Sequence, residues 1–93
     1  MLRTHQSKPG LLVLEGAATL ATAEELHSAL AGLLNEPEPV TVDTSGLQDL
    51  DTAGLQVLLA FVRARGAERT TCAGWPTPLR QLIQLAGLPE LLA

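Results

Sequence analysis

The apolar residues of this chain fall into short runs typical of strands, separated by longer stretches with helical spacing. Residues 10–16 form an apolar run bounded by glycines, which is the pattern of a buried strand. Residues 2–7 precede this run and are expected to pair with it as an edge strand. A brief β-branched, alternating segment at 40–43 and a segment around 69–73 predict two further strands.

The first predicted helix begins near Thr22. Thr22 and Glu25 have the spacing of a capping box, in which a hydroxyl and a carboxylate bond to free amides of the first turn. Two prolines within residues 36–39 end this element, because proline cannot extend a helix. The apolar stripe of the helix consists of Leu26, Leu30, Leu33 and Leu34.

The second predicted helix begins at Asp51 or Thr52 and ends before Gly66, since glycine commonly terminates helices. Arg63 and Arg65 lie near its carboxyl end, where the helix dipole favours positive charge. The inward-facing stripe of this helix is expected to consist of Leu55, Leu58, Leu59 and Val62.

The third predicted helix has Thr77 as its cap and Pro78 at the first helical position, where the missing amide of proline costs nothing. Gly87 closes it. Leu79, Leu82 and Ile83 are expected to face inward. Trp75 precedes this helix and is expected to pack on the core, with an exposed interface anchor as the alternative.

This order of elements predicts an α/β fold. Strands separated by crossover helices imply a four-stranded mixed, largely parallel sheet with three to four helices. The chain has 93 residues, of which 46% are hydrophobic, enough for one compact core and too few for two. Residues 1–93 are therefore predicted to form a single domain.

Charge and composition argue against several classes of partner. The net charge is −4, and the six Lys and Arg residues are dispersed, so no nucleic-acid partner is expected. Phe61 and Trp75 are the only aromatic residues, too few for a platform on which bases stack. No run of about 18 apolar residues occurs, so no insertion into a membrane is expected.

The N-terminus and the single cysteine bear on the cellular compartment. Arg3, His5 and Lys8 are not followed by the apolar run of a secretory signal. Cys72 has no second cysteine with which to form a disulfide or a structural zinc site, and we expect it to be a small core residue. Both features favour a cytoplasmic protein.

Residues suited to catalysis or metal binding are few. Ser7, Ser28 and Ser45 lack the context of a nucleophile elbow, and no glycine-rich phosphate loop occurs. His5 and His27 have no ligand partners at a recognised metal spacing and are predicted to be surface residues. No catalytic residue and no cofactor are therefore predicted.

Three carboxylates near the middle of the chain are the strongest metal candidates. Asp43, Asp49 and Asp51 could attract a magnesium ion, but such a site needs several converging oxygens. We therefore interpret them as loop and cap carboxylates and predict no metal site. Thr44 and Ser45 are expected to be turn residues.

The most informative motif joins the third strand to the second helix. Residues 43–55 read Asp-Thr-Ser-Gly-Leu-Gln-Asp-Leu-Asp-Thr-Ala-Gly-Leu and resemble the signature of the STAS family, whose best-known members are anti-sigma factor antagonists. In that family a strand ends in Asp and Asp-Ser-Ser-Gly-Leu opens the next helix. Residues 74–88 resemble the last loop and helix of the family. The positions that match the signature in spacing are Asp43, Leu47, Leu50, Asp51, Gly54 and Leu55.

The resemblance implies a SpoIIAA-like fold and a non-catalytic regulatory module that docks a partner protein. Ala53 stands where the family has its phosphorylated serine, so the usual phosphoswitch is missing and Thr52 is the remaining candidate phosphoacceptor. The alternative interpretation of Thr52 is a plain helix cap. The implied partner-binding residues are Asp51, Thr52, Ala53, Gly54 and Gln56.

The resemblance leaves the kind of protein partner open. Asp-Thr-Ala-Gly at 51–54 resembles the variant found in STAS subunits of phospholipid-transport ABC complexes and in STAS proteins of chemotaxis gene clusters. The candidate partners are therefore an anti-sigma factor or related serine kinase, a chemotaxis component, or an ABC ATPase. A small enzyme that uses the three aspartates is disfavoured, because acid–base catalysis needs carboxylates in buried, differing environments.

Overall fold

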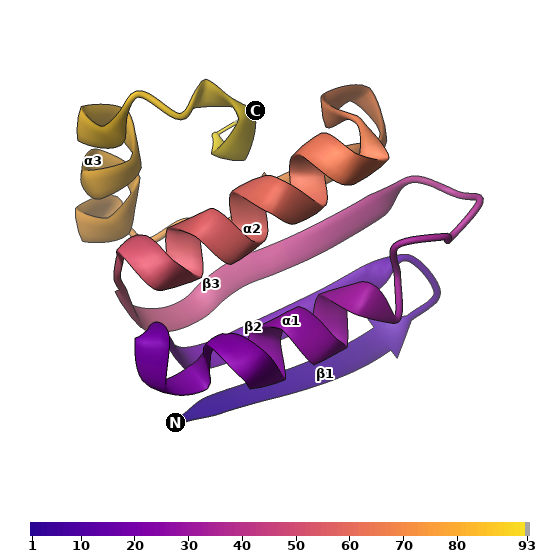
Figure 1. Cartoon of the computed structure of the whole chain (residues 1–93), viewed down its shortest axis with the longest axis horizontal. Helices are drawn as coiled ribbons and strands as arrows, with labels where there is room; N and C mark the ends of the chain where they lie inside the picture. The colour runs from indigo at the N-terminus through magenta and orange to yellow at the C-terminus, as the bar shows by residue number, and fades with distance from the viewer. Residues whose placement is uncertain (93) are drawn as a thin grey trace.

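A computed structural model describes residues 1–92 of the chain. The chain begins with a pair of strands, after which three α-helices alternate with two further strands (Figure 1). Three short 3-10 helices complete the fold: η1 (Leu20–Thr22), η2 (Ala67–Arg69) and η3 (Pro89–Leu91). The main elements in chain order are β1 (Leu2–Lys8), β2 (Leu11–Ala18), α1 (Ala23–Ala31), β3 (Val40–Leu50), α2 (Thr52–Arg65), β4 (Thr70–Ala73) and α3 (Thr77–Ala86).

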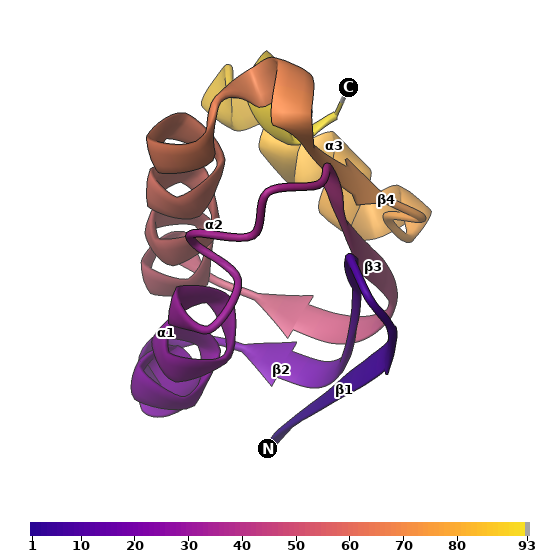
Figure 2. The same cartoon turned by 90° about the vertical axis from the view of Figure 1, so that its right-hand side faces the viewer.

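The strands form one sheet in the order β1-β2-β3-β4. β1 pairs antiparallel with β2, whereas β3 pairs in parallel with both β2 and β4. Helices α1 and α2 lie side by side on one face of the sheet, and α3 lies beyond the β4 edge (Figures 1 and 2). The predicted α/β fold with a mixed, largely parallel sheet is confirmed.

The core lies between the sheet and the two covering helices. The predicted inward stripe of α2 is confirmed, because Leu55, Leu58, Leu59 and Val62 are all buried. The central strands contribute alternate side chains to the same core, as expected for strands with one covered face. These buried strand residues include Leu12, Leu14, Val40, Val42, Leu47 and Leu50. Within residues 1–92, no helix has the length and apolar character needed to cross a membrane.

Strand β3 is longer than the sequence predicts. It continues past Asp43 to Leu50, because β2 runs beside it as far as Ala18 and supplies main-chain partners. Thr44 is therefore a buried strand residue, and its hydroxyl donates to the carbonyl of Ala73 at 2.8 Å. The prediction that Thr44 and Ser45 lie in a turn is wrong.

Helix α1 begins where the sequence predicts, but the predicted capping box is wrong. The Thr22 hydroxyl donates to the Ala17 carbonyl at 2.8 Å and accepts from the Thr19 amide at 3.0 Å. It therefore braces the turn before the helix and does not cap the first turn. Leu26, Leu30 and Leu33 are buried as predicted, whereas Leu34 lies past the helix end and is 41% exposed.

Helix α3 differs from its prediction by one residue. Pro76 occupies the cap position, Thr77 is the first helical residue and Pro78 the second. Leu79 and Ile83 face the core, but Leu82 is 37% exposed. The inward-facing stripe therefore has two of its three predicted residues, because α3 lies at the edge of the molecule (Figure 1) and more of its surface faces solvent.

Arg65 is the main core residue that the sequence analysis missed. The predicted role was a favourable charge at the end of α2, but its side chain is buried. Its Nε donates to the Thr70 hydroxyl at 3.1 Å, and its two terminal nitrogens donate to main-chain carbonyls at 2.9–3.4 Å. These carbonyls belong to Leu33, Leu34, Glu36, Glu38 and Arg69. Arg65 thus supplies hydrogen-bond partners to the proline-containing link between α1 and β3.

We expect Arg65→Lys to lower the free energy of unfolding by about 1–3 kcal/mol, because an ammonium cannot reach this spread of buried carbonyls. Denaturant titration measures the change. Arg63→Lys is the matched control, since Arg63 is exposed and pairs with Glu90 at the surface. The control should change stability by less than about 0.5 kcal/mol. Equal losses in the two variants would show that the hydrogen-bond geometry of Arg65 is unimportant.

Candidate partner-binding site

Asp51 lies between the end of β3 and the start of α2, and its carboxylate holds two elements together. One oxygen, Oδ1, accepts from the Gly54 amide at 3.0 Å and caps the helix. The other, Oδ2, accepts from the Leu20 amide at 2.9 Å and ties η1 to the helix start. These bonds, from Gly54 first and then from Leu20, lower the pKa of Asp51 below its ordinary value of 3.8. Asp51 is the cap, so the interpretation of Thr52 as the helix cap is wrong.

Gly54 permits the first turn of α2 to pack directly on the end of β2. A Cβ atom at this position would lie 2.0 Å from the Ala18 carbonyl oxygen and 2.7 Å from the Ala18 carbonyl carbon. No other residue fits without moving the helix, because both contacts are to main-chain atoms. Gly54 is buried, so a partner protein cannot contact it. Its role is to set the position of the first turn of α2 against β2.

The remaining predicted partner-binding residues lie on the outer side of this turn. Thr52 is exposed at the first helical position, Ala53 is half-buried, and Gln56 is exposed one turn further along. Because Asp51 already accepts from the Gly54 amide, the Thr52 side chain is not needed to begin the helix. Thr52 and Gln56 thus form an exposed polar edge on α2.

Leu20 is an exposed residue of the same region that sequence analysis missed. It is 77% exposed, although its main chain is fixed by Asp51. η1 lies beside the start of α2 at one end of the molecule (Figure 1). In the sequence, the one sign of this role was that Leu20 lies outside the predicted apolar stripes. Its exposure depends on the turn that the Thr22 hydroxyl stabilises, which the sequence does not reveal.

Asp43 and Asp49 lie within β3, so their interpretation as loop carboxylates is wrong, and each carboxylate bonds to a nearby residue of the same strand. The Asp43 carboxylate accepts from the amide and hydroxyl of Ser45 at 3.0 and 2.7 Å. The Asp49 carboxylate accepts from the Leu50 amide at 2.9 Å. Across residues 1–92, no three side chains of His, Cys, Asp or Glu come together as a group that could hold a metal ion.

The remaining singled-out residues lie as the sequence predicts. Trp75 is buried, and its indole Nε1 donates to the Leu91 carbonyl at 2.6 Å, which fastens the C-terminal η3 to the core. Cys72 is buried in β4, and burial raises the pKa of its thiol to about 12. His5 and His27 are exposed.

Sequence comparison places the entire chain in one family. The family described as "Mlab, STAS domain" matches residues 1–93. The chain belongs to the STAS domain family. Among curated proteins, none matches this STAS domain.

Solved structures share the fold of this STAS domain at low sequence identity. An anti-sigma factor antagonist from Mycobacterium paratuberculosis is 24% identical, with a TM-score of 0.82, over 97% of this chain and 81% of the other. Unphosphorylated SpoIIAA, an anti-sigma factor antagonist, is 14% identical, with a TM-score of 0.67, over 91% of this chain and 83% of the other. Phosphorylated SpoIIAA of Bacillus is 16% identical, with a TM-score of 0.68, over 98% of this chain and 88% of the other. The predicted SpoIIAA-like fold is confirmed.

We expect Asp51→Asn to lower the melting temperature at pH 7, because the amide cannot accept from both Leu20 and Gly54 as the carboxylate does. The pKa of Asp51 is lower in the folded state, so its contribution is fully present above the ordinary carboxyl pKa and is lost as the pH falls through the folded-state pKa. The difference between parent and variant should therefore shrink in acid.

Thermal melts from pH 7 down to pH 2 test this expectation, with Asp49→Asn as the control. Asp49 is exposed and bonds only to the amide of its neighbour, so its variant should follow the parent at every pH. A gap between Asp51→Asn and the parent that stays constant in acid would contradict the role given to the ionised carboxylate.

Proposed function

We propose that this STAS domain is a non-catalytic, cytoplasmic regulatory module, a single domain over residues 1–93, that binds a partner protein. Its docking surface consists of Leu20, Thr52, Ala53 and Gln56. The observation that carries the proposal is the exposed side chain of Leu20, a residue whose main-chain amide donates to the carboxylate of Asp51 at the start of α2. Asp51 and Gly54 support this surface from within.

The physical argument rests on pre-organisation. Exposed leucine is unfavourable in water, and here its main chain is fixed in place, so a partner that buries it gains apolar contact without ordering a loop. Thr52 and Gln56 add hydrogen-bonding groups beside this apolar centre. The buried centre of a protein interface is typically apolar and is bordered by a polar rim, an arrangement that Leu20 with Thr52 and Gln56 would provide.

A second candidate function is a STAS accessory subunit of a phospholipid-transport ABC complex. Asp-Thr-Ala-Gly at 51–54 and the family description "Mlab, STAS domain" favour it. This function predicts stoichiometric co-purification with an ABC ATPase. Co-purification with an anti-sigma factor, a related serine kinase or a chemotaxis component would instead support regulation of the anti-sigma factor antagonist type.

A third candidate is an antagonist switched by phosphorylation of Thr52, whose hydroxyl is exposed. The charges disfavour it. Asp51 already occupies the Gly54 amide, and its lowered pKa keeps it negative beside any phosphate on Thr52. Two negative groups would then compete for one helix end.

We expect Thr52 from native cells to carry little or no phosphate, because of that competition and because the family's phosphoacceptor position is Ala53. Intact-mass and peptide mass spectrometry of the endogenous protein measure the occupancy. Stoichiometric phosphate on Thr52 would contradict this expectation and support the switch.

We expect Thr52→Asp to weaken partner binding while leaving the melting temperature nearly unchanged. An added carboxylate near a helix start is compatible with the dipole, but an uncompensated charge in an interface is costly. Pull-down from native cells with quantitative mass spectrometry identifies the partner, and titration with that partner measures the affinity.

Thr77→Asp is the matched control, because Thr77 is also an exposed threonine at the first position of a helix. It should retain the parent's affinity. Equal affinity of Thr52→Asp and the parent for the identified partner would refute the docking surface.

A further inference from the structure

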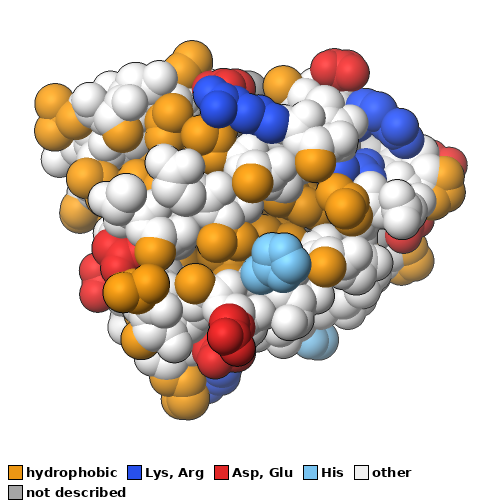
Figure 3. Space-filling view, viewed as in Figure 1, with side chains coloured by type: hydrophobic (Ala, Val, Ile, Leu, Met, Phe, Trp, Pro, Cys, Tyr) orange, Lys and Arg blue, Asp and Glu red, His pale blue; other side chains and the backbone are white. Residues whose placement is uncertain are grey.

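An apolar groove separates the exposed sides of α1 and α2. Its volume is about 560 Å³, within the roughly 300–1,000 Å³ typical of clefts that receive ligands. Hydrophobic side chains gather at the centre of this face of the molecule, and charged ones lie toward its edges (Figure 3). None of the nine lining residues is Lys, Arg, Asp or Glu.

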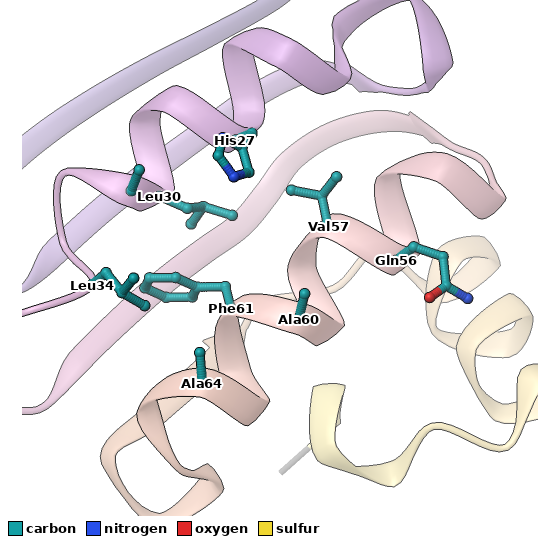
Figure 4. Close-up of a pocket in the computed structure, with 9 residues that line it drawn as sticks. His27, Leu30, Leu34, Gln56, Val57, Ala60, Phe61 and Ala64 are labelled. Carbon is teal, nitrogen blue, oxygen red and sulfur yellow. The ribbon is translucent and has the colours of Figure 1, made fainter.

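The floor and walls of the groove come from α1, the segment just after it, and α2. Leu30 and Phe61 are buried and form its floor, whereas Leu34 and Val57 are only partly covered (Figure 4). Leu34 is the residue that departed from the predicted inward stripe, and its side chain lies beside the Phe61 ring (Figure 4). An occupant of the groove would cover this leucine.

Three exposed alanines leave the groove open. Ala31 of α1 and Ala60 and Ala64 of α2 line it with side chains too short to close it. Small side chains on facing helices let a further helix approach closely, with its own side chains set into the gap between the two. This shape favours a row of aliphatic side chains on one helix over a compact polar ligand.

The groove is continuous with the docking surface. Gln56 belongs to both, and Thr52, Gln56 and Ala60 follow one another at four-residue spacing along one side of α2. η1, which carries Leu20, contacts the same helix at its start. A partner that covers Leu20 and Thr52 can therefore extend along α2 into the groove without leaving the protein surface.

From this continuity we propose that the groove receives an amphipathic helix of the same partner protein that covers the docking surface. This inference rests on the proposed function. The bound helix presents aliphatic side chains at i, i+3 or i+4, and i+7, with no charge on that face, because the groove offers no counter-charge. His27 and Gln56 are its polar lining residues and can bond to polar groups flanking the apolar row.

Site-specific photocrosslinking in native cells tests the occupant. p-Benzoylphenylalanine replaces Leu20 in one variant, Ala60 in a second and the exposed Ala67 of η2, outside the groove, in a third. We expect positions 20 and 60 to crosslink to the same protein. Mass spectrometry should place the position-60 crosslink in a peptide with the apolar helical spacing above, and position 67 should not capture that peptide.

The outcomes separate the two proposals. A partner crosslink at position 20 combined with a lipid, a second copy of this chain or no adduct at position 60 overturns the groove inference and leaves the docking surface standing. Absence of a protein crosslink at both positions overturns both.

Affinity measurements with the captured partner provide the quantitative test. Ala60→Glu should weaken binding at least about tenfold, since it places an unpaired charge in an apolar contact. Ala67→Glu adds the same charge outside the groove and should retain the parent's affinity within about twofold. Similar melting temperatures for both variants exclude misfolding, and equal affinities would overturn the inference.

Discussion

The carboxylate of Asp51 is the interaction on which the geometry of the candidate site depends. It accepts from Gly54 within α2 and from Leu20 in η1, two segments far apart in the sequence. The contact is possible only because Gly54 has no side chain and the helix start packs on the Ala18 carbonyl. If Asp51 or Gly54 were replaced, Leu20 and Thr52 would no longer be held in fixed positions relative to each other. The site is thus a consequence of how β2, η1 and α2 meet.

The sequence predicted the parts of the fold that local patterns determine. Leu55, Leu58, Leu59 and Val62 recur at helical spacing, and packing that side of the helix inward removes the stripe from water. The strand at 40–43 was likewise visible from alternation, but its extension to Leu50 was not. That extension depends on pairing with β2, and a polar segment such as Thr44–Ser45 carries no local sign of such a partner.

Residues whose roles depend on distant main-chain atoms could not be predicted from the sequence. Arg65 followed the pattern of a solvated charge at a helix end, yet its bonds reach carbonyls about thirty positions away. The exposure of Leu20 likewise follows from bonds made by Thr22 and Asp51. For the candidate site, the motif identified Asp51 and Thr52, but only the packing separates the supporting residues Asp51 and Gly54 from the exposed Thr52 and Gln56.

The chemistry of the supporting residues favours constant docking over a switch. Asp51 has a lowered pKa and is ionised at neutral pH. Its charge is constant near neutrality, so it cannot move the docking surface in response to small changes in pH. Ala53 stands where the resemblance to the STAS signature implies a phosphorylated serine, so this chain has no hydroxyl there. Under the proposed function, we therefore expect the docking surface to bind its partner without a charge switch of its own.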